Sequence, residues 1–447
     1  MQFPSEAFIL IVSPYPFTDD NQVIPHFKVQ KRLNLKIGAK EPELTMRIEI
    51  PHETERLGAV LIHSVQKVFE LDTGLSCESD EMDNRASVMQ RIPYDVLNEI
   101  KKQMAIIVPM RNERIKLVEG VLSGIPNQCL TIILSNSSRE PVDRFAIEQA
   151  AFGNFSRFVK KDVIVVHQKD PVLVEACRQA GYADVIDEST GLVKDGKAEG
   201  MILATLLARL SSRCYIGFID ADNYFPGAVL EYINEYAAGF SMSTSPYTMT
   251  RIAWHSKPKI IEDQLFFAKW GRTSRNTNQF LNALIAEYTG FETDVIKTGN
   301  AGEHAMTMDL AMLLDYSSGY SIEPYHYINL FERFGGQAGT ELPQERVNQP
   351  VEIFQIESRN PHMHDVDKGE EHIDKMTYAA MQVIYHSPAC PQRLKKRLLK
   401  EMRSLNLLDK KETPSDVIYY PNLGGVNLDA FAAALEERPF TQFLLSQ

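Results

Sequence analysis

Cysteine is scarce in this chain, and the few cysteines form no pattern. The 447 residues include five cysteines, all far apart and with no C-x-x-C pair: Cys77, Cys129, Cys177, Cys214 and Cys390. An odd and scattered set argues against a disulfide framework and favours a reducing, cytoplasmic setting. Cys129 and Cys214 lie beside apolar runs, so we predict that both are core residues rather than nucleophiles.

Long apolar runs and a surplus of positive charge are also missing. No run of about 18 apolar residues occurs, so no membrane span is predicted. The apolar stretch from Phe8 to Val12 is too short for the core of a secretory signal. With 47 basic and 59 acidic residues the net charge is −12, which argues against binding to nucleic acid or to an anionic membrane. A small phosphorylated substrate is compatible with this charge, because a few local arginines and lysines can hold one phosphate.

Short apolar runs do alternate with amphipathic stretches from residue 104 onward. Strands are predicted at 104–109, 130–135, 162–168 and 214–220, and helices at 114–125, 142–152, 171–181 and 197–210. This order predicts right-handed βαβ crossovers and an α/β fold, with a mostly parallel sheet covered by helices on both faces. Ligands of such sheets bind beyond the carboxyl ends of the strands.

The second half of the chain has a less regular pattern. Strands are predicted at 249–255, 264–270 and 351–358, helices at 280–288, 303–314, 371–386 and 390–405, and a polar loop or lid at 335–348. We divide the chain into an N-terminal extension, an α/β region, and a partly helical C-terminal region: 1–45, 46–240 and 241–447. Translation from Met46 is an alternative interpretation of the extension.

The most informative motif follows the fourth predicted strand. Asp220 and Asp222, separated by Ala221, come directly after an apolar run. The strand would deliver two carboxylates to the carboxyl edge of the sheet, where hard oxygen ligands suit Mg²⁺ or Mn²⁺ on a diphosphate. Because a D-x-D alone is common in loops, the prediction depends on its place at a strand end.

Two further residues complete the predicted metal and phosphate site. His362 follows the predicted strand 351–358 and is preferred as a metal ligand over His364, because Pro361 holds it in an extended turn. Lys197 begins the helix 197–210, and a helix N-terminus with a lysine attracts phosphate. A surface loop histidine and a solvated lysine are the alternatives.

Other strand ends and loops carry weaker signals. Pro109 and Glu113 follow the first strand, and Ser135 and Asn136 follow the second, where they can contact a nucleoside or serve as ordinary cap and loop residues. The segment 270–275 combines glycine, hydroxyls and two arginines, which suits an anionic acceptor. Segment 298–304 is a second small-residue loop, in which Glu303 faces the site or caps a helix.

The ordered set of motifs resembles one family, the mannosyl-3-phosphoglycerate synthases. The matching motifs are VPMRNE (108–113), SNSSR (135–139), HQKDP (167–171), GKAEGM (196–201), FIDADNYFPGAV (218–229), KWGR (269–272), TGNAGEHAM (298–306), SIEPY (321–325) and NPHMH (360–364). They span about residues 46–400 in order, and the last 40 residues match only loosely.

The resemblance implies a Rossmann-like GT-A glycosyltransferase fold and a retaining transfer of mannose from GDP-mannose to 3-phosphoglycerate, which leads to the compatible solute mannosylglycerate. It implies a divalent metal, Mg²⁺ with Mn²⁺ or Co²⁺ as alternatives, and a homodimer. The implied sites are donor contacts at Pro109, Glu113, Ser135, Asn136, Lys197, Asp220 and Ala221, acceptor contacts at Gly271, Arg272, Ser274, Thr298 and Asn300, metal ligands at Asp222 and His362, and catalytic roles for Asp220, Lys197 and Glu303.

Three alternatives stay open at this point. The D-x-D and phosphate loops do not define the sugar, so transfer of glucose is the first alternative. A sugar nucleotidyltransferase is disfavoured, because VPMRNE stands where such enzymes carry a glycine-rich loop. A binding protein without catalysis would bind the donor and release no GDP.

Overall fold

The computed structural model describes residues 45–70, 89–223, 225–261, 264–268, 272–336, 349–363 and 370–436. Of the predicted extension 1–45, only residue 45 is among them. The predicted loop or lid at 335–348 lies outside the described residues except for its first two positions. In the described ranges, no helix is long and apolar enough to cross a membrane.

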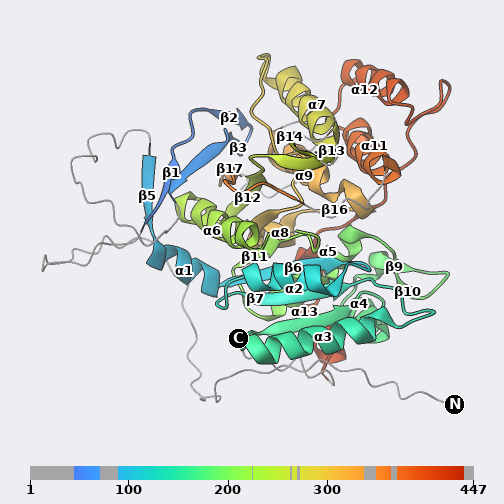
Figure 1. Ribbon diagram of the computed structural model, residues 1–447. Helices are drawn as coiled ribbons and strands as arrows, with labels where there is room; N and C mark the ends of the chain where they lie inside the picture. Colours follow the sequence, from blue (N-terminus) through green and yellow to red (C-terminus); the bar gives the residue numbers. More distant parts are fainter. Residues whose placement is uncertain are drawn as a thin grey trace, which may run out of the picture.

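A 12-stranded sheet forms the centre of the molecule, in the order β5-β1-β4-β17-β12-β15-β11-β6-β7-β8, with β2 and β3 at the side of β17 (Figure 1). Its strands are β1 Thr45–Glu49, β2 Thr54–Leu57, β3 Val60–His63, β4 Gln66–Glu70, β5 Met89–Pro93, β6 Met104–Met110, β7 Leu130–Ser135, β8 Val163–His167, β11 Tyr215–Phe218, β12 Tyr247–Ala253, β15 His304–Thr307 and β17 Val351–Glu357. The strands β11, β6, β7 and β8 are parallel, as predicted.

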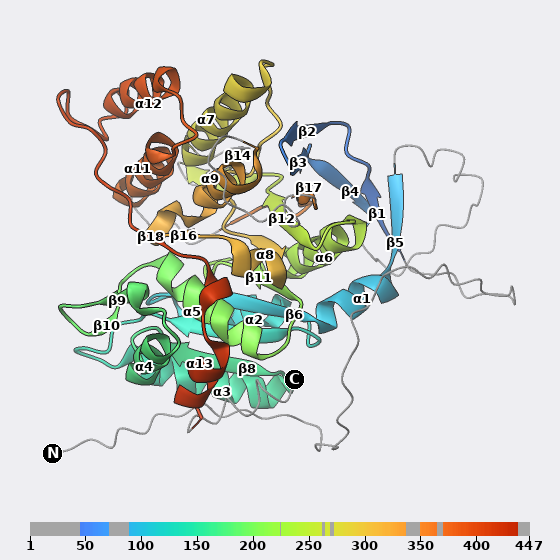
Figure 2. The ribbon, with the colours of Figure 1, turned by 180° about the vertical axis from the view of Figure 1, so that it is seen from behind.

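Helices cover both faces of this sheet. They are α1 Tyr94–Lys102, α2 Ile115–Gly124, α3 Arg144–Val159, α4 Pro171–Gln179, α5 Lys197–Leu210, α6 Pro226–Met242, α7 Arg272–Thr289, α8 Met308–Leu313, α9 Ile322–Phe334, α11 Glu370–His386, α12 Gln392–Ser404 and α13 Leu428–Ala434. Figure 1 shows α2 and α3 in front, and Figure 2, from behind, shows α5 and α13. All four helices predicted between residues 114 and 210 are confirmed.

The alternation of side chains along β6 shows why the sheet has two cores. Ile107 packs into one buried cluster with residues of α5, such as Met201, whereas the next residue, Val108, packs into a second cluster with Val121 of α2. Since successive side chains of a strand point to opposite faces, a strand covered on both sides is apolar throughout. The continuous apolar runs of the sequence are therefore those of a sheet covered on both faces. The structure contains this sheet, so the predicted α/β class is confirmed.

Two sequence predictions are wrong. The helix predicted at 303–314 begins only at Met308, because residues 304–307 form β15, which pairs antiparallel with both β11 and β12. An apolar run of this length does not distinguish strand from helix, and pairing with two neighbours decided it. Cys214 is exposed, not a core residue, whereas Cys129 is buried as predicted.

The second half of the chain contributes strands to the same sheet, and its last helix packs against helices of the first half. Strands β12, β15 and β17 lie in the central sheet, while β13 Lys257–Ile261 and β14 Gln264–Ala268 form a separate hairpin. Helices α7, α9, α11 and α12 gather at one end of the molecule. Helix α13 packs against α4 and α5. The boundary at residue 240 remains a prediction, and both sides of it contribute to one sheet.

Candidate nucleotide and metal site

The turn after β11 lies at the edge predicted for the ligand. Because β6, β7, β8 and β11 are parallel, their carboxyl ends meet at this edge. Asn223 closes the turn through its side-chain amide, which donates to the carbonyl oxygen of Asp220 at 3.0 Å. Ala221 and Asp222 are buried, and the side chain of Asp220 is 30% exposed. The turn therefore leaves the carboxylate of Asp220 partly exposed, whereas Asp222 is buried.

Lys197 lies between two carboxylates from different parts of the chain. Its Nζ is 2.6 Å from Oδ1 of Asp220 and 2.8 Å from Oε1 of Glu323. Burial alone lowers the pKa of this ammonium group, but the two carboxylates outweigh it and hold the pKa of Lys197 well above its usual value. Lys197 is therefore a fixed positive charge at the N-terminus of α5.

Glu323 is a site residue that the sequence analysis missed. It is the second residue of α9, it is 4% exposed, and its carboxylate contacts Lys197. The signal was an acidic residue in the first turn of a helix, within the SIEPY motif. Such residues usually interact with the helix dipole at the surface, so the sequence did not single it out.

Glu303 is fully buried beside the same turn. Its Oε1 accepts a hydrogen bond from the side-chain amide of Asn223 at 2.8 Å, and its Oε2 accepts one from Nε1 of Trp254 at 3.0 Å. Burial, and next the charge of Asp220, raise the pKa of Glu303 to about 7. The capping alternative for Glu303 is wrong, because β15 and not a helix follows it.

His362 comes from a turn that is held at several points. Its backbone N–H donates to the carbonyl of Ser256 at 2.8 Å, and its buried ring stacks on the indole of Trp254 with centroids 4.5 Å apart. The carboxylate of Glu231 accepts hydrogen bonds from the backbone N–H groups of Arg359 and Asn360 at 2.5 and 2.9 Å. His364 lies outside the described residues.

The loops after β6 and β7 interlock on the predicted nucleoside side. Asn112 has a φ of 62°, the left-handed region that asparagine tolerates, and its backbone N–H donates to Oγ of Ser137 at 2.7 Å. Its side-chain oxygen accepts from the N–H of Ser138 at 2.9 Å. The carboxylate of Glu113 accepts a hydrogen bond from the backbone N–H of Arg111, and Pro109 pairs in register with Leu134.

Two predicted donor contacts at the carboxyl end of β7 have different surroundings. Ser135 is fully buried, and its hydroxyl donates to Oε2 of Glu148 in α3 at 2.7 Å. Asn136 is more open, and its amide donates to Oδ1 of Asp195 at 3.1 Å, two residues before Lys197. Of the two, Asn136 is the residue that the fold brings near the N-terminus of α5.

The predicted acceptor residues come from two neighbouring segments. Gly271 lies outside the described residues, Arg272 is the first residue of α7, and Ser274 is buried in its first turn. The hydroxyl of Thr298 is 2.8 Å from both Tyr327 and Gln355. Asn300 is 7% exposed, and neither its amide nitrogen nor its amide oxygen has a hydrogen-bond partner among the described residues.

Arg251 links the loop at Thr298 to Glu323 beside Lys197. This fully buried guanidinium group donates to the carbonyl oxygens of Thr298 at 2.9 Å and Glu323 at 3.2 Å, and it lies over the ring of Tyr327. A buried charge needs this density of partners, since isolation from water is costly. Arg251 was not anticipated, because its spacing within β12 is that of an ordinary strand residue.

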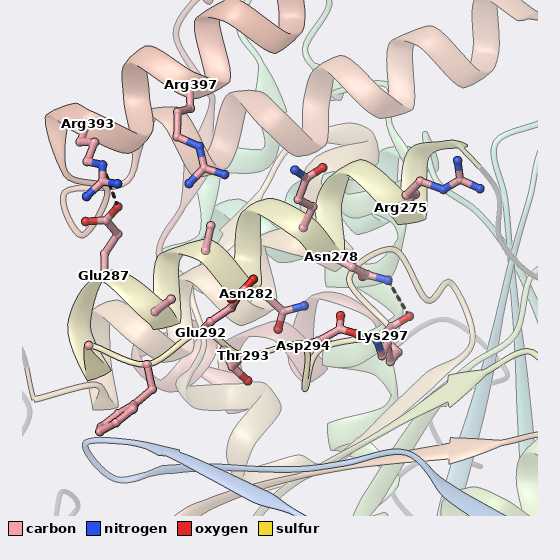
Figure 3. Close-up of a pocket in the computed structure, with 15 residues that line it drawn as sticks. Arg275, Asn278, Asn282, Glu287, Glu292, Thr293, Asp294, Lys297, Arg393 and Arg397 are labelled. Carbon is pink, nitrogen blue, oxygen red and sulfur yellow. Dashed lines mark hydrogen bonds and ion pairs between the residues drawn. The ribbon is translucent and has the colours of Figure 1, made fainter.

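A separate cavity of about 880 Å³ lies between α7, α12 and the loop after α7 (Figure 3). Its basic lining residues are Arg275, Lys297, Arg393 and Arg397. Two of them face acids: Arg393 is 3.9 Å from Glu287, and Lys297 pairs with Asp294. On the floor, Asn278 donates to the carbonyl of Lys297 at 2.9 Å. The bond from Asn278 thus ties the loop that leads to Thr298 to α7. Three acidic side chains line the cavity beside the four basic ones, so most of its charge is balanced.

Comparison with known proteins identifies the family. A family model described as mannosyl-3-phosphoglycerate synthase matches residues 50–435. The mannosyl-3-phosphoglycerate synthase of Pyrococcus furiosus is 43% identical over 396 residues, covering 89% of this chain and 98% of that protein. The chain belongs to the mannosyl-3-phosphoglycerate synthase family. The namesake from Aeropyrum pernix is 34% identical over 83% of this chain and 93% of its own length. The predicted family, and with it a glycosyltransferase, is confirmed.

Solved structures show more distant similarity. Glucosyl-3-phosphoglycerate synthase from Mycobacterium tuberculosis, in complex with Mg²⁺ and uridine diphosphate, is 16% identical with a TM-score of 0.43, covering 66% of this chain and 84% of that one. Mannosyl-3-phosphoglycerate synthase from Rubrobacter xylanophilus is 13% identical with a TM-score of 0.42, covering 73% and 91%.

Proposed function

We propose that this chain transfers mannose from GDP-mannose to 3-phosphoglycerate, with retention of the anomeric configuration, and releases mannosyl-3-phosphoglycerate and GDP. The observation that carries the proposal is the Lys197 ammonium group held between Asp220 and Glu323 at the carboxyl edge of the sheet. Membership of the family and near-complete coverage of the Pyrococcus furiosus relative support the choice of reaction. A cytoplasmic location and a homodimer remain predictions.

Residues for a divalent cation are present in the turn after β11 and near it, since contacts through Trp254 and Glu303 link His362 to Asn223. Asp222 and His362 offer a carboxylate oxygen and an imidazole nitrogen, both 5% exposed, and this donor set suits Mg²⁺, Mn²⁺ or Co²⁺. The described part of the chain contains no group of three or more histidine, cysteine or acidic side chains placed to hold a metal. A cation here would therefore take further ligands from the donor diphosphate and water. It would neutralise charge on the leaving nucleotide.

The chain's own residues supply positioning and charge. Lys197 remains protonated because of its two carboxylates, so it can stabilise negative charge that develops on the leaving diphosphate. Asp220 is fixed by Lys197 and lies against Gly302, where a Cβ atom would approach its Oδ2 to 2.4 Å. A side chain at position 302 would therefore displace this carboxylate or the loop that carries position 302.

The acceptor side is proposed to use the start of α7 and the loop before β15. Gly271, Arg272 and Ser274 would bind the phosphate of the acceptor, since arginine and hydroxyl donors match its oxygens. Thr298 and Asn300 would face its other end. The buried amide of Asn300, which has no hydrogen-bond partner in the part of the chain that the structure describes, supports this role. The acceptor hydroxyl would then reach the anomeric carbon from the side on which GDP leaves.

A GDP-release assay tests the proposed function. Purified protein with Mg²⁺ is incubated with GDP-mannose, GDP-glucose or UDP-glucose, each with and without 3-phosphoglycerate. We expect release that depends on the acceptor and is fastest with GDP-mannose. Faster turnover of a glucose donor would assign the chain to glucosyl transfer, and donor binding with no release under any condition would make it a binding protein.

A further inference from the structure

Trp254 contacts the predicted metal ligand and the buried glutamate at the same time. It directly follows β12 and is 7% exposed. Its indole ring stacks on His362 with an interplanar angle of 24°, and its N–H donates to Oε2 of Glu303 at 3.0 Å. The same ring lies 3.7 Å from Nζ of Lys257. One side chain thus joins groups from three segments of the chain.

The contact with His362 has a physical consequence for metal binding. A histidine ring rotates with broad freedom about its last side-chain bond. A histidine that binds a metal must instead keep the lone pair of one ring nitrogen directed at the ion. The bond from His362 to Ser256 fixes the backbone and not the ring. The flat face of Trp254 restricts the ring plane, because a stacked imidazole cannot rotate without leaving the indole.

We propose that Trp254 is a positioning residue for the transfer reaction: it fixes the ring plane of His362 for the cation and holds the Glu303 carboxylate beside Asn223. This inference rests on the proposed function, because His362 matters as a ligand only if the reaction uses a metal. The two contacts are separable by substitution. Trp254→Phe keeps a face for His362 and removes the N–H, whereas Trp254→Leu removes both.

Binding of Mn²⁺ in the presence of GDP, measured from the electron paramagnetic resonance signal of the free ion, gives a readout apart from activity. Substitution of groups that orient a metal ligand weakens metal binding by about 10- to 100-fold. We expect about a tenfold weaker affinity in Trp254→Leu and less than about a threefold change in Trp254→Phe. Because Trp254→Phe loses the bond to Glu303, its kcat should fall about tenfold with little change in KM for 3-phosphoglycerate.

Phe240→Leu is the matched control. Phe240 is also 7% exposed and stacks on Tyr215 with centroids 4.5 Å apart and an angle of 27°, at the opposite end of β11 from Asp220. Phe240→Leu removes the same kind of buried aromatic stack. The variant should therefore have a lower midpoint of thermal unfolding and an unchanged affinity for Mn²⁺. A Trp254→Leu protein that is as destabilised as the control and binds Mn²⁺ like wild type would overturn the inference.

A fluorescence measurement tests the inference with Trp254 left in place. The chain contains two tryptophans, so Trp270→Phe leaves Trp254 as the sole indole. Mn²⁺ added with GDP should change its emission, and His362→Ala should abolish that response and weaken Mn²⁺ binding. An unchanged emission on saturation with Mn²⁺ would contradict the inference. If His362→Ala binds Mn²⁺ normally, the metal assignment in the proposed function fails as well.

Discussion

The Lys197 site and the cavity between α7 and α12 both combine basic side chains with carboxylates, but in different surroundings. Each sets a basic side chain against carboxylates. Lys197 is 17% exposed and lies within 2.8 Å of two acids, whereas Arg393 is 81% exposed and 3.9 Å from Glu287. Water screens the second pair, and such surface pairs contribute about 0–1 kcal/mol. The comparison teaches that burial, and not the residue types, makes a charge pair a candidate for catalysis.

The largest effect is expected from removing the buried carboxylate of the D-x-D turn. Asp222→Ala should lower kcat by more than about 1000-fold, because the proposed cation would lose one of its two proposed protein ligands. The fold should persist, since Asn223 still closes the turn through the carbonyl of Asp220. Steady-state kinetics with circular dichroism checks this, and full activity in the variant would remove the metal assignment from Asp222.

The difference between the two sites can be tested by substituting one basic residue in each of them. Lys197→Ala should reduce kcat about 100- to 1000-fold, the usual loss when a fixed charge that stabilises a transition state is removed. It also removes the ammonium group that lies between the carboxylates of Asp220 and Glu323. Arg393→Ala should change kcat by less than about twofold. Equal losses in the two variants would refute the distinction between the buried and the exposed site.

Position 302 gives a smaller and more local test. In Gly302→Ala the new methyl group meets the carboxylate of Asp220, and displacement of a catalytic group by about 1 Å can cost up to about 100-fold in rate. We expect at least about a tenfold loss in kcat. Gly153→Ala in α3 is the control, because no atom lies within 4 Å of its Cβ position. The control should keep its activity and gain about 0.5–1 kcal/mol in stability.

Glu235 extends the comparison to buried carboxyl groups outside the site. Both of its oxygens lack a hydrogen-bond partner among the described residues, and burial, with Glu231 and Glu357 nearby, raises the pKa of Glu235 well above its usual value. Above the ordinary glutamate pKa, the unfolded chain releases this proton while the fold keeps it. Folding then loses about 1.4 kcal/mol per pH unit until the folded pKa is reached.

Glu235→Gln removes the pH-dependent loss of folding stability that Glu235 causes. The variant should unfold at a higher denaturant concentration than wild type at about pH 8. The advantage should shrink at about pH 5, because this pH is close to the ordinary pKa of glutamate and little of the pH-dependent loss has accumulated there. Denaturant unfolding at the two pH values measures this difference. A gain that is the same at both values would show that Glu235 is not held neutral by the fold.

The family and the parallel sheet could be predicted from the sequence because their signals are local. Apolar runs of strand length define β6, β7, β8 and β11, and Asp220 follows the last of them by chain order alone. Lys197 was predicted from its place at a helix start. Strand β15 was missed, because its identity depends on pairing with β11 and β12, which are separated from it by tens of residues.

The sequence by itself determined which residues lie at the ends of the parallel strands, because the period of the apolar pattern and the chain order are properties of neighbours. Only the tertiary structure decided what those residues contact. The Lys197–Glu323 pair spans 126 positions, and Arg251 reaches Glu323 across 72. Partners at such separations meet because helices and strands pack into one core, and the energy of a charge depends on that burial rather than on its neighbours in the chain.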